Sequence, residues 1–337
     1  MQPILTIGIT SYNRVNELIR CVTSIQTNYC EDIEIIVSED CSPMSSEIGE
    51  AVKKLKAESK YDIKFMPNEH NLGYDGNLGA IIQKSQGEYV FLISDDDAMY
   101  DGFLDILIPF LKNPENKSYG VLYAAIADQY NGRKNRNHQV DMIIPKGEES
   151  AIKYVYDPIL FSGLVFKKDY VKDIDAKSFL NMNYIQVYYF LKMIHHYGGY
   201  YFAYPSVCMV GDGENAYGIA ESSGGNEKIA DRTKVVSNIE FHRTLIQVIK
   251  RFDSEEGTHV IAAFENQYSL RSYMQMAIAR KESVATLKEF WSGMKSLDIH
   301  IKPIAYAYYY SLLILGTKIC NGLTYYARRK TKHDDKI

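Results

Sequence analysis

The chain has 337 residues, of which 46% are hydrophobic and 24% are charged, a composition typical of a soluble globular protein. This length predicts two domains, or one large domain with an extension. The formal net charge of −4 argues against a nucleic-acid partner, because proteins that bind nucleic acid usually carry a strong basic patch. The five cysteines are scattered and form no metal-binding cluster, which predicts free thiols in a reducing compartment.

The first 112 residues alternate between short apolar runs and stretches with helical spacing. The predicted strands are residues 4–10, 33–38, 63–66 and 89–93, and a helix is expected after each of them. Apolar residues spaced like Leu18, Val22 and Ile25 mark the buried face of the first helix. This alternation predicts βαβ units, and therefore an α/β fold with a doubly wound, mainly parallel sheet flanked by helices.

The pattern is looser from residue 118 onward. Strands are predicted at 121–127 and 200–210, a helix at 184–196, a strand or buried turn at 159–166, and a polar, basic loop at 131–138. The five glycines of residues 211–225 predict a loop that is a candidate lid. We expect one domain over residues 1–225, with halves 1–112 and 113–225, followed by a helical C-terminal region over 226–337.

Residues 304–327 are strongly apolar and lead into Arg328-Arg329-Lys330-Thr331-Lys332. Lys318 and Asn321 interrupt the apolar stretch, which argues against a transmembrane helix. Two interpretations stay open: a packed terminal helix, or a helix that makes peripheral membrane contact through residues 304–332. No signal peptide is evident, so we expect a cytoplasmic location, with the inner face of the cell membrane as the place for such a contact.

Three consecutive carboxylates, Asp95, Asp96 and Asp97, directly follow the fourth predicted strand. Like charges repel one another and resist burial unless they are compensated, and a divalent cation such as Mg²⁺ or Mn²⁺ would compensate them. Open α/β sheets bind their ligands at the carboxyl ends of the strands, where this triplet lies. The alternative is an acidic turn that caps the helix beginning near Asp101.

The other three strands also end in polar residues, namely Thr10-Ser-Tyr-Asn-Arg14, Ser38-Glu-Asp-Cys-Ser42 and Asn71-Leu-Gly-Tyr-Asp-Gly-Asn77. In a doubly wound sheet these ends can line one crevice. Taken singly, Asn71-Leu-Gly73 is also typical of an ordinary turn, and Asp40 of a helix cap. Together, the four segments resemble the inverting nucleotide-sugar glycosyltransferases of family 2, which have the GT-A fold. Motif order, spacing and strand placement all match over residues 4–112, and this combination makes the resemblance specific.

The resemblance implies a role for each matched position. The implied nucleotide-sugar-binding residues are Thr10, Tyr12, Arg14, Asp40, Asn71, Gly73, Asn77 and Asp95. Among them, Asp40 would bond to the base edge, and Gly73 would let the backbone approach the nucleotide closely. The donor would be a nucleotide-diphosphate sugar, most commonly a UDP-sugar in such enzymes.

The family's metal motif is Asp-x-Asp, and here Ser94 occupies its first position. Asp96 is then the expected direct ligand of Mn²⁺ or Mg²⁺, although Asp95 and Asp97 are also spaced Asp-x-Asp and leave the ligand set open. Asp97 and Asp212 are the further candidate ligands. The ion would neutralise the leaving diphosphate while an acceptor hydroxyl attacks the anomeric carbon with inversion.

A general base should take the proton of that hydroxyl. Relatives often carry an acidic pair for this purpose at the start of a late helix, where this chain has Ile185-Gln186-Val187. Gln186 cannot act as a base, so it is either a surface glutamine or a contact to the acceptor hydroxyl. The candidate substitute bases are Asp157, Asp212 and Glu214.

The sequence therefore predicts an enzyme that transfers a sugar to a glycan or lipid-linked acceptor during surface polysaccharide synthesis. A sugar nucleotidyltransferase is one alternative, although residues 8–14 lack the glycine-rich basic loop that would hold a triphosphate. A non-catalytic carbohydrate-binding protein with a degenerate site is another, because the acidic pair is missing. The dinucleotide-binding and P-loop glycine motifs are both absent from the sequence, which argues against those classes.

Overall fold

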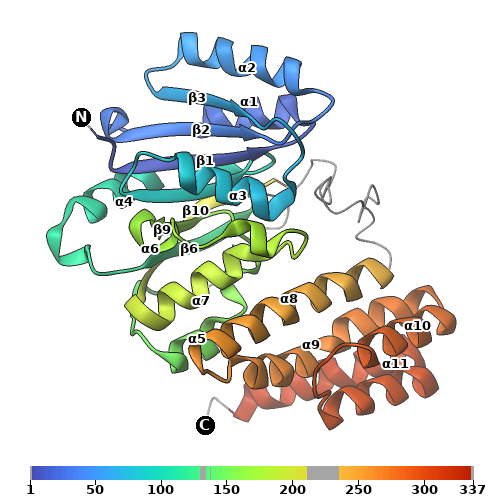
Figure 1. Cartoon of the computed structure of the whole chain (residues 1–337). Helices are drawn as coiled ribbons and strands as arrows, with labels where there is room; N and C mark the ends of the chain where they lie inside the picture. Colours follow the sequence, from blue (N-terminus) through green and yellow to red (C-terminus); the bar gives the residue numbers. More distant parts are fainter. Residues whose placement is uncertain (1, 130–133, 137, 211–234, 335–337) are drawn as a thin grey trace. The chain divides into compact units, whose positions relative to one another are not determined.

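The computed structural model describes residues 2–129, 134–136, 138–210 and 235–334 of the chain (Figure 1). Contacts within the chain separate two compact units, residues 1–230 and 231–337, and each is described by itself. The first unit is α/β and the second is helical. The predicted boundary after residue 225 falls outside the described residues and stays a prediction.

The predicted strand–helix alternation is confirmed in the first part of the chain. The strands are β1 (Leu5–Ser11), β2 (Ile33–Glu39), β3 (Asp62–Pro67) and β4 (Tyr89–Ser94). The helices that follow them are α1 (Val15–Ser24), α2 (Ser45–Glu58), α3 (Gly73–Lys84) and α4 (Phe103–Lys112). These strands are parallel and lie in the order β3-β2-β1-β4, so strand order reverses direction between β1 and β4.

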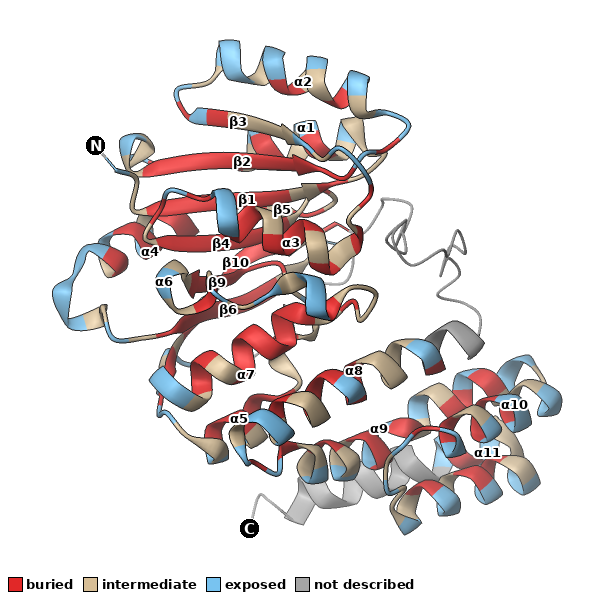
Figure 2. Ribbon diagram, in the orientation of Figure 1, coloured by how far each residue is buried: buried red, intermediate tan, exposed pale blue. Residues whose placement is uncertain are grey.

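Helices cover both faces of the sheet, which explains why its central strands are buried throughout (Figure 2). On one face, Leu5, Ile7 and Ile9 of β1 belong to a hydrophobic core shared with α1, α2 and α4. On the other face, a Cβ atom on Gly8 would overlap the side chain of Ile81 from α3. The glycine therefore lets α3 pack directly on β1, and the resulting switch point between β1 and β4 is where such sheets bind ligands.

The second half of the sheet adds strands of both directions. The long strands here are β6 (Val121–Asp128) and β10 (Gly199–Met209), and the short ones are β5 (Ala98–Met99), β7 (Lys134–Asn135), β8 (Met142–Ile144) and β9 (Leu164–Lys167). The order continues β4-β9-β6-β10-β5, with β7 beside β6 and β8 beside β10. All long strands run in one direction and the short strands oppose them, which confirms a mainly parallel, doubly wound sheet. The loop prediction for residues 131–138 is wrong at β7, because its backbone pairs with β6.

A buried carboxylate joins the two halves of the first unit. The helical segments of the second half are α5 (Glu148–Tyr154), α6 (Lys168–Val171) and α7 (Ile185–Tyr197), with the 3₁₀ turns η3 (Asp157–Ile159) and η4 (Ala176–Phe179). Asp75 of α3 accepts hydrogen bonds from the backbone N–H groups of Asn183 at 2.7 Å and Ile185 at 3.0 Å. Because these N–H groups lie at the start of α7, Asp75 caps that helix from a different element.

The second unit consists of α8 (Val235–Glu256), α9 (Val260–Glu282), α10 (Val284–Lys295) and α11 (Pro303–Asp334). Asp253 of α8 accepts hydrogen bonds from the N–H groups of Val260 and Ile261, both at 2.8 Å, and so caps α9. Gly316 interrupts α11 with a φ of 73°, and the carbonyl of Leu312 instead accepts a bond from Arg280 at 3.0 Å. Within the described ranges, none of the helices is long and apolar enough to cross a membrane.

We predict that Asp75→Ala destabilises the protein, because it leaves the N–H groups of Asn183 and Ile185 buried without an acceptor. The expected loss is about 1–3 kcal/mol of unfolding free energy for each such group. Urea unfolding would measure this loss, with Asp173→Ala, which removes an exposed acid, as the matched control. Equal unfolding midpoints for the two variants would show that Asp75 does not hold α7.

Candidate active site

An ion pair joins the ends of β1 and β4 at the switch point. Arg14 Nη1 lies 2.8 Å from Asp95 Oδ1, and the backbone N–H of Tyr12 donates to Asp95 Oδ2 at 3.3 Å. Burial raises the pKa of Asp95 to about 7, and the Arg14 guanidinium opposes this shift. Both oxygens of Asp95 are therefore bound to the segment after β1, which makes this residue a clamp between the two strands.

Asp96 and Asp97 complete the acidic triplet, and their carboxylates are oriented differently from that of Asp95. Ser94 Oγ donates to Asp96 Oδ1, Arg14 Nη1 lies 3.3 Å from Asp96 Oδ2, and Asp96 is the least buried of the three acids. Burial and the charge of Asp96 raise the pKa of Asp97 to about 7. The alternative that the triplet caps α4 is excluded, because that helix begins after Gly102 and no side chain caps it.

The residues present fit a divalent cation. Asp96 and Asp97 offer carboxylate oxygens, the ligand type that Mg²⁺ and Mn²⁺ prefer. Arg14 forms ion pairs with Asp95 and Asp96, and one guanidinium cannot neutralise three adjacent acids. A bound cation would relieve the remaining repulsion. Asp95 fits less well as a ligand, because Arg14 and Tyr12 bind its two oxygens and its side chain is more deeply buried than that of Asp96.

Asp40, after β2, fixes the loop that precedes α3. Its Oδ1 accepts hydrogen bonds from the N–H of Leu72 at 2.8 Å and from Asn68 Nδ2 at 2.9 Å, and burial raises its pKa to about 6. Gly73 begins α3 with a φ of 68°, and its N–H donates to Asn71 Oδ1 at 2.7 Å. The structure thus brings the predicted residues Asp40, Asn71 and Gly73 together.

Two other features near the ends of β1 and β2 bear on the predicted binding of a nucleotide. Asn77 bonds within the fold, since its Oδ1 accepts from Ser38 Oγ at 2.6 Å and its Nδ2 donates to the Ser38 carbonyl at 3.2 Å. Its assignment to the nucleotide stays a prediction. In contrast, Ser11 Oγ, Glu39 Oε2 and Ser42 Oγ are buried without a partner among the described residues. Buried polar atoms are normally satisfied, so these three are available to a ligand.

Residues 157–163, which comprise η3 and the segment before β9, carry further predicted site residues. Asp157 Oδ2 accepts from the hydroxyl of Tyr123 at 2.9 Å and lies 3.1 Å from His138 Nε2. Gln186 Nε2 donates to the carbonyl of Ile159 at 3.2 Å. Gln186 is 1% exposed, so the surface-glutamine interpretation is wrong, because this face of α7 packs into the unit. Asp212, Glu214 and the candidate lid at 211–225 lie outside the described residues.

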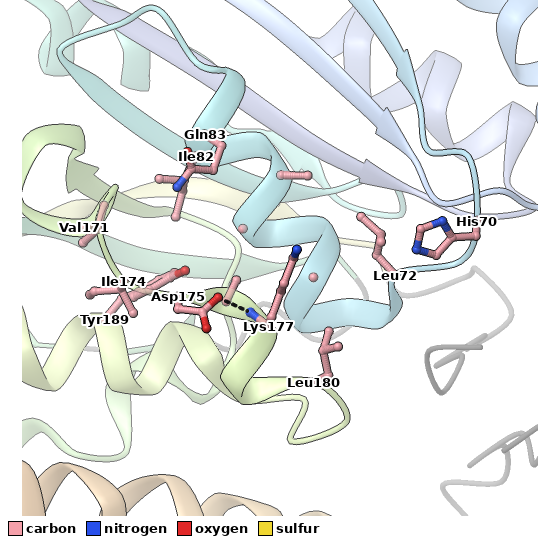
Figure 3. A pocket seen from close by; sticks show the side chains of 14 residues that line it. His70, Leu72, Ile82, Gln83, Val171, Ile174, Asp175, Lys177, Leu180 and Tyr189 are labelled. Carbon is pink, nitrogen blue, oxygen red and sulfur yellow. Dashed lines mark hydrogen bonds between the residues drawn. The ribbon is translucent and has the colours of Figure 1, made fainter. Parts of the chain in front are cut away.

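An apolar cavity of about 430 Å³ lies on the outer side of α3 (Figure 3). Gly76, Gly79 and Ala80 of α3 form part of its wall because they carry little or no side chain, and Leu180 and Tyr189 face them. None of the acids of the triplet lines it, so this cavity is separate from the candidate cation site. The sequence did not predict it, since its lining combines α3 with α6, η4 and α7, which lie far from α3 in the sequence.

Comparison with known proteins identifies the class. Residues 6–174, half of the chain, match the family model described as Glycosyl transferase family 2, and the chain belongs to this family. Over 106 residues it is 30% identical to a GalNAc(5)-diNAcBac-PP-undecaprenol beta-1,3-glucosyltransferase of Campylobacter jejuni, covering 32% of this chain and 34% of the relative. Over 110 residues it is 30% identical to the abequosyltransferase RfbV of Salmonella typhimurium, covering 32% of each. The match spans about a third of these relatives.

Solved structures share the fold. TarS 1-349 of S. aureus in complex with UDP aligns with a TM-score of 0.52 at 13% identity, covering 93% of this chain and 88% of that one. The mannosyltransferase PcManGT from Pyrobaculum calidifontis, in complex with GDP-Man and Mn²⁺, aligns with a TM-score of 0.51 at 14% identity, covering 96% and 81%. The expected GT-A architecture, with its parallel-rich sheet between helices, is confirmed.

We predict that Arg14→Met lowers the unfolding free energy by about 3–5 kcal/mol at pH 8, because it leaves the Asp95 carboxylate buried without its counter-ion. Losing the cation also raises the pKa of Asp95 further, so the carboxyl is protonated and the loss is smaller at pH 5. Denaturant unfolding of the full chain at both pH values measures this. The double variant Arg14→Met/Asp95→Asn should recover much of the stability, and no recovery would contradict the clamp.

Proposed function

We propose that this protein transfers a sugar from a nucleotide-diphosphate donor, with a UDP-sugar first among the candidates, to a hydroxyl of a glycan or lipid-linked acceptor. The observation that carries the proposal is the ion pair of Arg14 with the triplet at the switch point of the sheet, with Asp40 at the end of the neighbouring strand β2. The named glucosyltransferase and abequosyltransferase relatives support a role in surface polysaccharide synthesis. The neighbours in complex with UDP and with GDP-Man support a nucleotide donor.

The proposed binding mode follows the sheet. Asp40 and the loop that it fixes would hold the base and ribose, and Ser11 and Ser42 have free hydroxyl groups on the same side. Asp96 and Asp97 would hold Mn²⁺ or Mg²⁺, which when bound would neutralise the charge of the departing diphosphate. This arrangement needs no protein nucleophile, so direct attack by the acceptor hydroxyl would invert the anomeric carbon.

Asp157 is our candidate for the general base among the described residues. Its carboxylate is 16% exposed and pairs with His138, so a proton that it accepts can be shared with the imidazole. Tyr123 fixes the orientation of the carboxylate through its hydroxyl. Gln186 occupies the position of the family's acidic pair and cannot take a proton, so we propose it as a substrate contact.

Asp96→Asn tests the proposed function. It keeps the size of the side chain but removes a charge from the proposed cation site, so we expect turnover of the nucleotide sugar to fall roughly 100-fold or more. Calorimetry should also show weaker nucleotide binding in Mn²⁺ but little change in EDTA. Asp101→Asn, at an exposed acid after the triplet, is the matched control. Full activity of Asp96→Asn would refute the site assignment, and no transfer or hydrolysis of any nucleotide sugar by the wild type would refute the function.

We also propose that the second unit makes peripheral contact with an anionic membrane surface. Leu270, Met274 and Ile278 form an exposed apolar stripe on α9, with exposures of 50%, 68% and 59%. Tyr306, Tyr310 and Ile314 form another on α11, which packs on α9. Residues 303–317 contain no charged side chain, and the basic sequence 328–332 follows them. Exposed apolar stripes followed in the sequence by basic residues suit lipid headgroups, and this proposal extends the predicted contact at 304–332 to α9.

Vesicle sedimentation tests the membrane contact. We expect Met274→Glu/Ile314→Glu to abolish binding to vesicles that contain phosphatidylglycerol, because two acids would enter the apolar face and face anionic lipid. Ser292→Glu, at an exposed position on α10, is the control and should bind like the wild type. Equal binding by all three proteins would contradict the proposal. If the wild type is a dimer and the double variant is a monomer, the stripes would instead be assigned to a contact between copies of this chain.

A further inference from the structure

A buried arginine is linked to the acidic triplet through a single intervening residue. Ser162 Oγ accepts from the N–H of Ser94 at 3.1 Å and donates to the carboxylate of Asp97. The carbonyl of the same Ser162 accepts from Arg136 Nη1 at 3.1 Å. Ser162 therefore connects the proposed cation site to Arg136, which the sequence analysis assigned to a polar, basic loop.

The fold holds Arg136 firmly in this position. Its Nε donates to the carbonyl of Asp157 at 2.7 Å, and its own carbonyl accepts a hydrogen bond from the hydroxyl of Tyr201. The guanidinium carbon lies 6.0 Å from the ring centre of Tyr123, within the range of a cation–π contact. The backbone φ of Arg136 is 50°, a left-handed conformation that few residues other than glycine adopt without strain.

Arg136 nevertheless keeps an unused donor. The residue is 9% exposed, and its Nη2 has no hydrogen-bond partner among the residues that the structure describes. The bonds of its other nitrogens go to neutral carbonyls rather than to carboxylates. A buried guanidinium with an unsatisfied N–H costs stability, and an oxygen atom of a ligand would remove that cost.

Gln186 of α7, which also holds the segment 157–163, carries a hydrogen-bond acceptor that has no partner among the described residues. Gln186 binds the carbonyl of Ile159 through Nε2, while its buried Oε1 has no partner in the described part of the chain. Arg136 and Gln186 thus anchor residues 157–163 at different points, and each retains one unmet polar atom. Sugar hydroxyls both donate and accept hydrogen bonds, so a sugar offers a suitable partner to each of the two atoms.

We propose that Arg136 and Gln186 bind the transferred sugar of the nucleotide donor and contribute to the choice of that sugar. Arg136 Nη2 donates to an oxygen substituent of the ring, and Gln186 Oε1 accepts from a hydroxyl group. The inference rests on the proposed function. It follows the order of the sheet: the nucleotide lies at the ends of β2 and β1, the diphosphate at β4, and the sugar beside β9 and β6, the next strands.

Comparison of two ligands isolates this contact. Calorimetry in Mn²⁺ would measure the affinity of the full chain for UDP and for the UDP-sugar that the wild type binds most tightly. For Arg136→Gln and for Gln186→Leu we expect UDP affinity to stay within about twofold of the wild type. Affinity for the UDP-sugar should fall about tenfold or more for Arg136→Gln, the usual size of a lost hydrogen bond to a charged group, and about fivefold for Gln186→Leu, which loses a bond between neutral groups.

Three control variants make the comparison specific. Asp40→Asn should weaken UDP and the UDP-sugar equally, because it acts on the shared nucleotide. Lys146→Gln removes an exposed positive charge and should change neither affinity. Arg136→Lys keeps the charge but loses the forked geometry of the guanidinium, so we expect an intermediate loss for the UDP-sugar.

The outcomes separate this inference from the proposed function. Equal weakening of UDP and UDP-sugar by Arg136→Gln and by Gln186→Leu would overturn the inference, and so would unchanged UDP-sugar affinity with a raised KM for the acceptor. If Arg136→Gln does not fold, Gln186→Leu and Arg136→Lys decide by the same comparison. A wild type that binds UDP but no UDP-sugar would overturn the proposed function itself.

Discussion

The Arg14–Asp95 ion pair is the contact on which the arrangement of the site depends. It spans the switch point, where β1 and β4 are neighbours and the helices after β1 and β3 cover opposite faces of the sheet. Three adjacent acids could not be packed there without a counter-charge, because burial already raises the pKa of Asp95 and Asp97. Arg14 and the N–H of Tyr12 bind the two oxygens of Asp95, which makes it the structural acid of the triplet, and Asp96 is the most exposed of the three and the first candidate ligand.

Different strand ends of the sheet carry different parts of the proposed site. The ends of β1 and β2 carry unmet hydroxyl and carboxylate oxygens beside Asp40, and the end of β4 carries the candidate cation ligands. Beyond β4, the antiparallel strand β9 begins after residues 157–163, which Arg136 and Gln186 hold in place. In our proposal, neighbouring strand ends therefore contact successive parts of the donor: first the base, then the diphosphate, and then the sugar.

The sequence predicted the parts of this structure that depend on local periodicity. The early strands and helices repeat clear patterns, and the polar residues after β1, β2 and β4 meet because parallel strands end at one edge. Arg136 was missed because residues 131–138 are polar apart from one glycine, which is typical of a solvated loop, and no local signal shows that one of them turns inward. The burial of Gln186 and the stripe on α9 depend on which side of a helix is packed, which a single sequence determines poorly.

The site lowers the stability of the fold, and this argues that it still binds a ligand. Three non-glycine residues at its strand ends, Asn13, Cys41 and Arg136, have φ values of 59°, 53° and 50°. Unmet buried polar atoms lie beside them, including Arg136 Nη2. Strained backbone and unsatisfied polar groups lower stability, so mutation would remove them from a scaffold that had lost its ligand. Their joint presence around the candidate cation ligands favours a working donor site over a degenerate one.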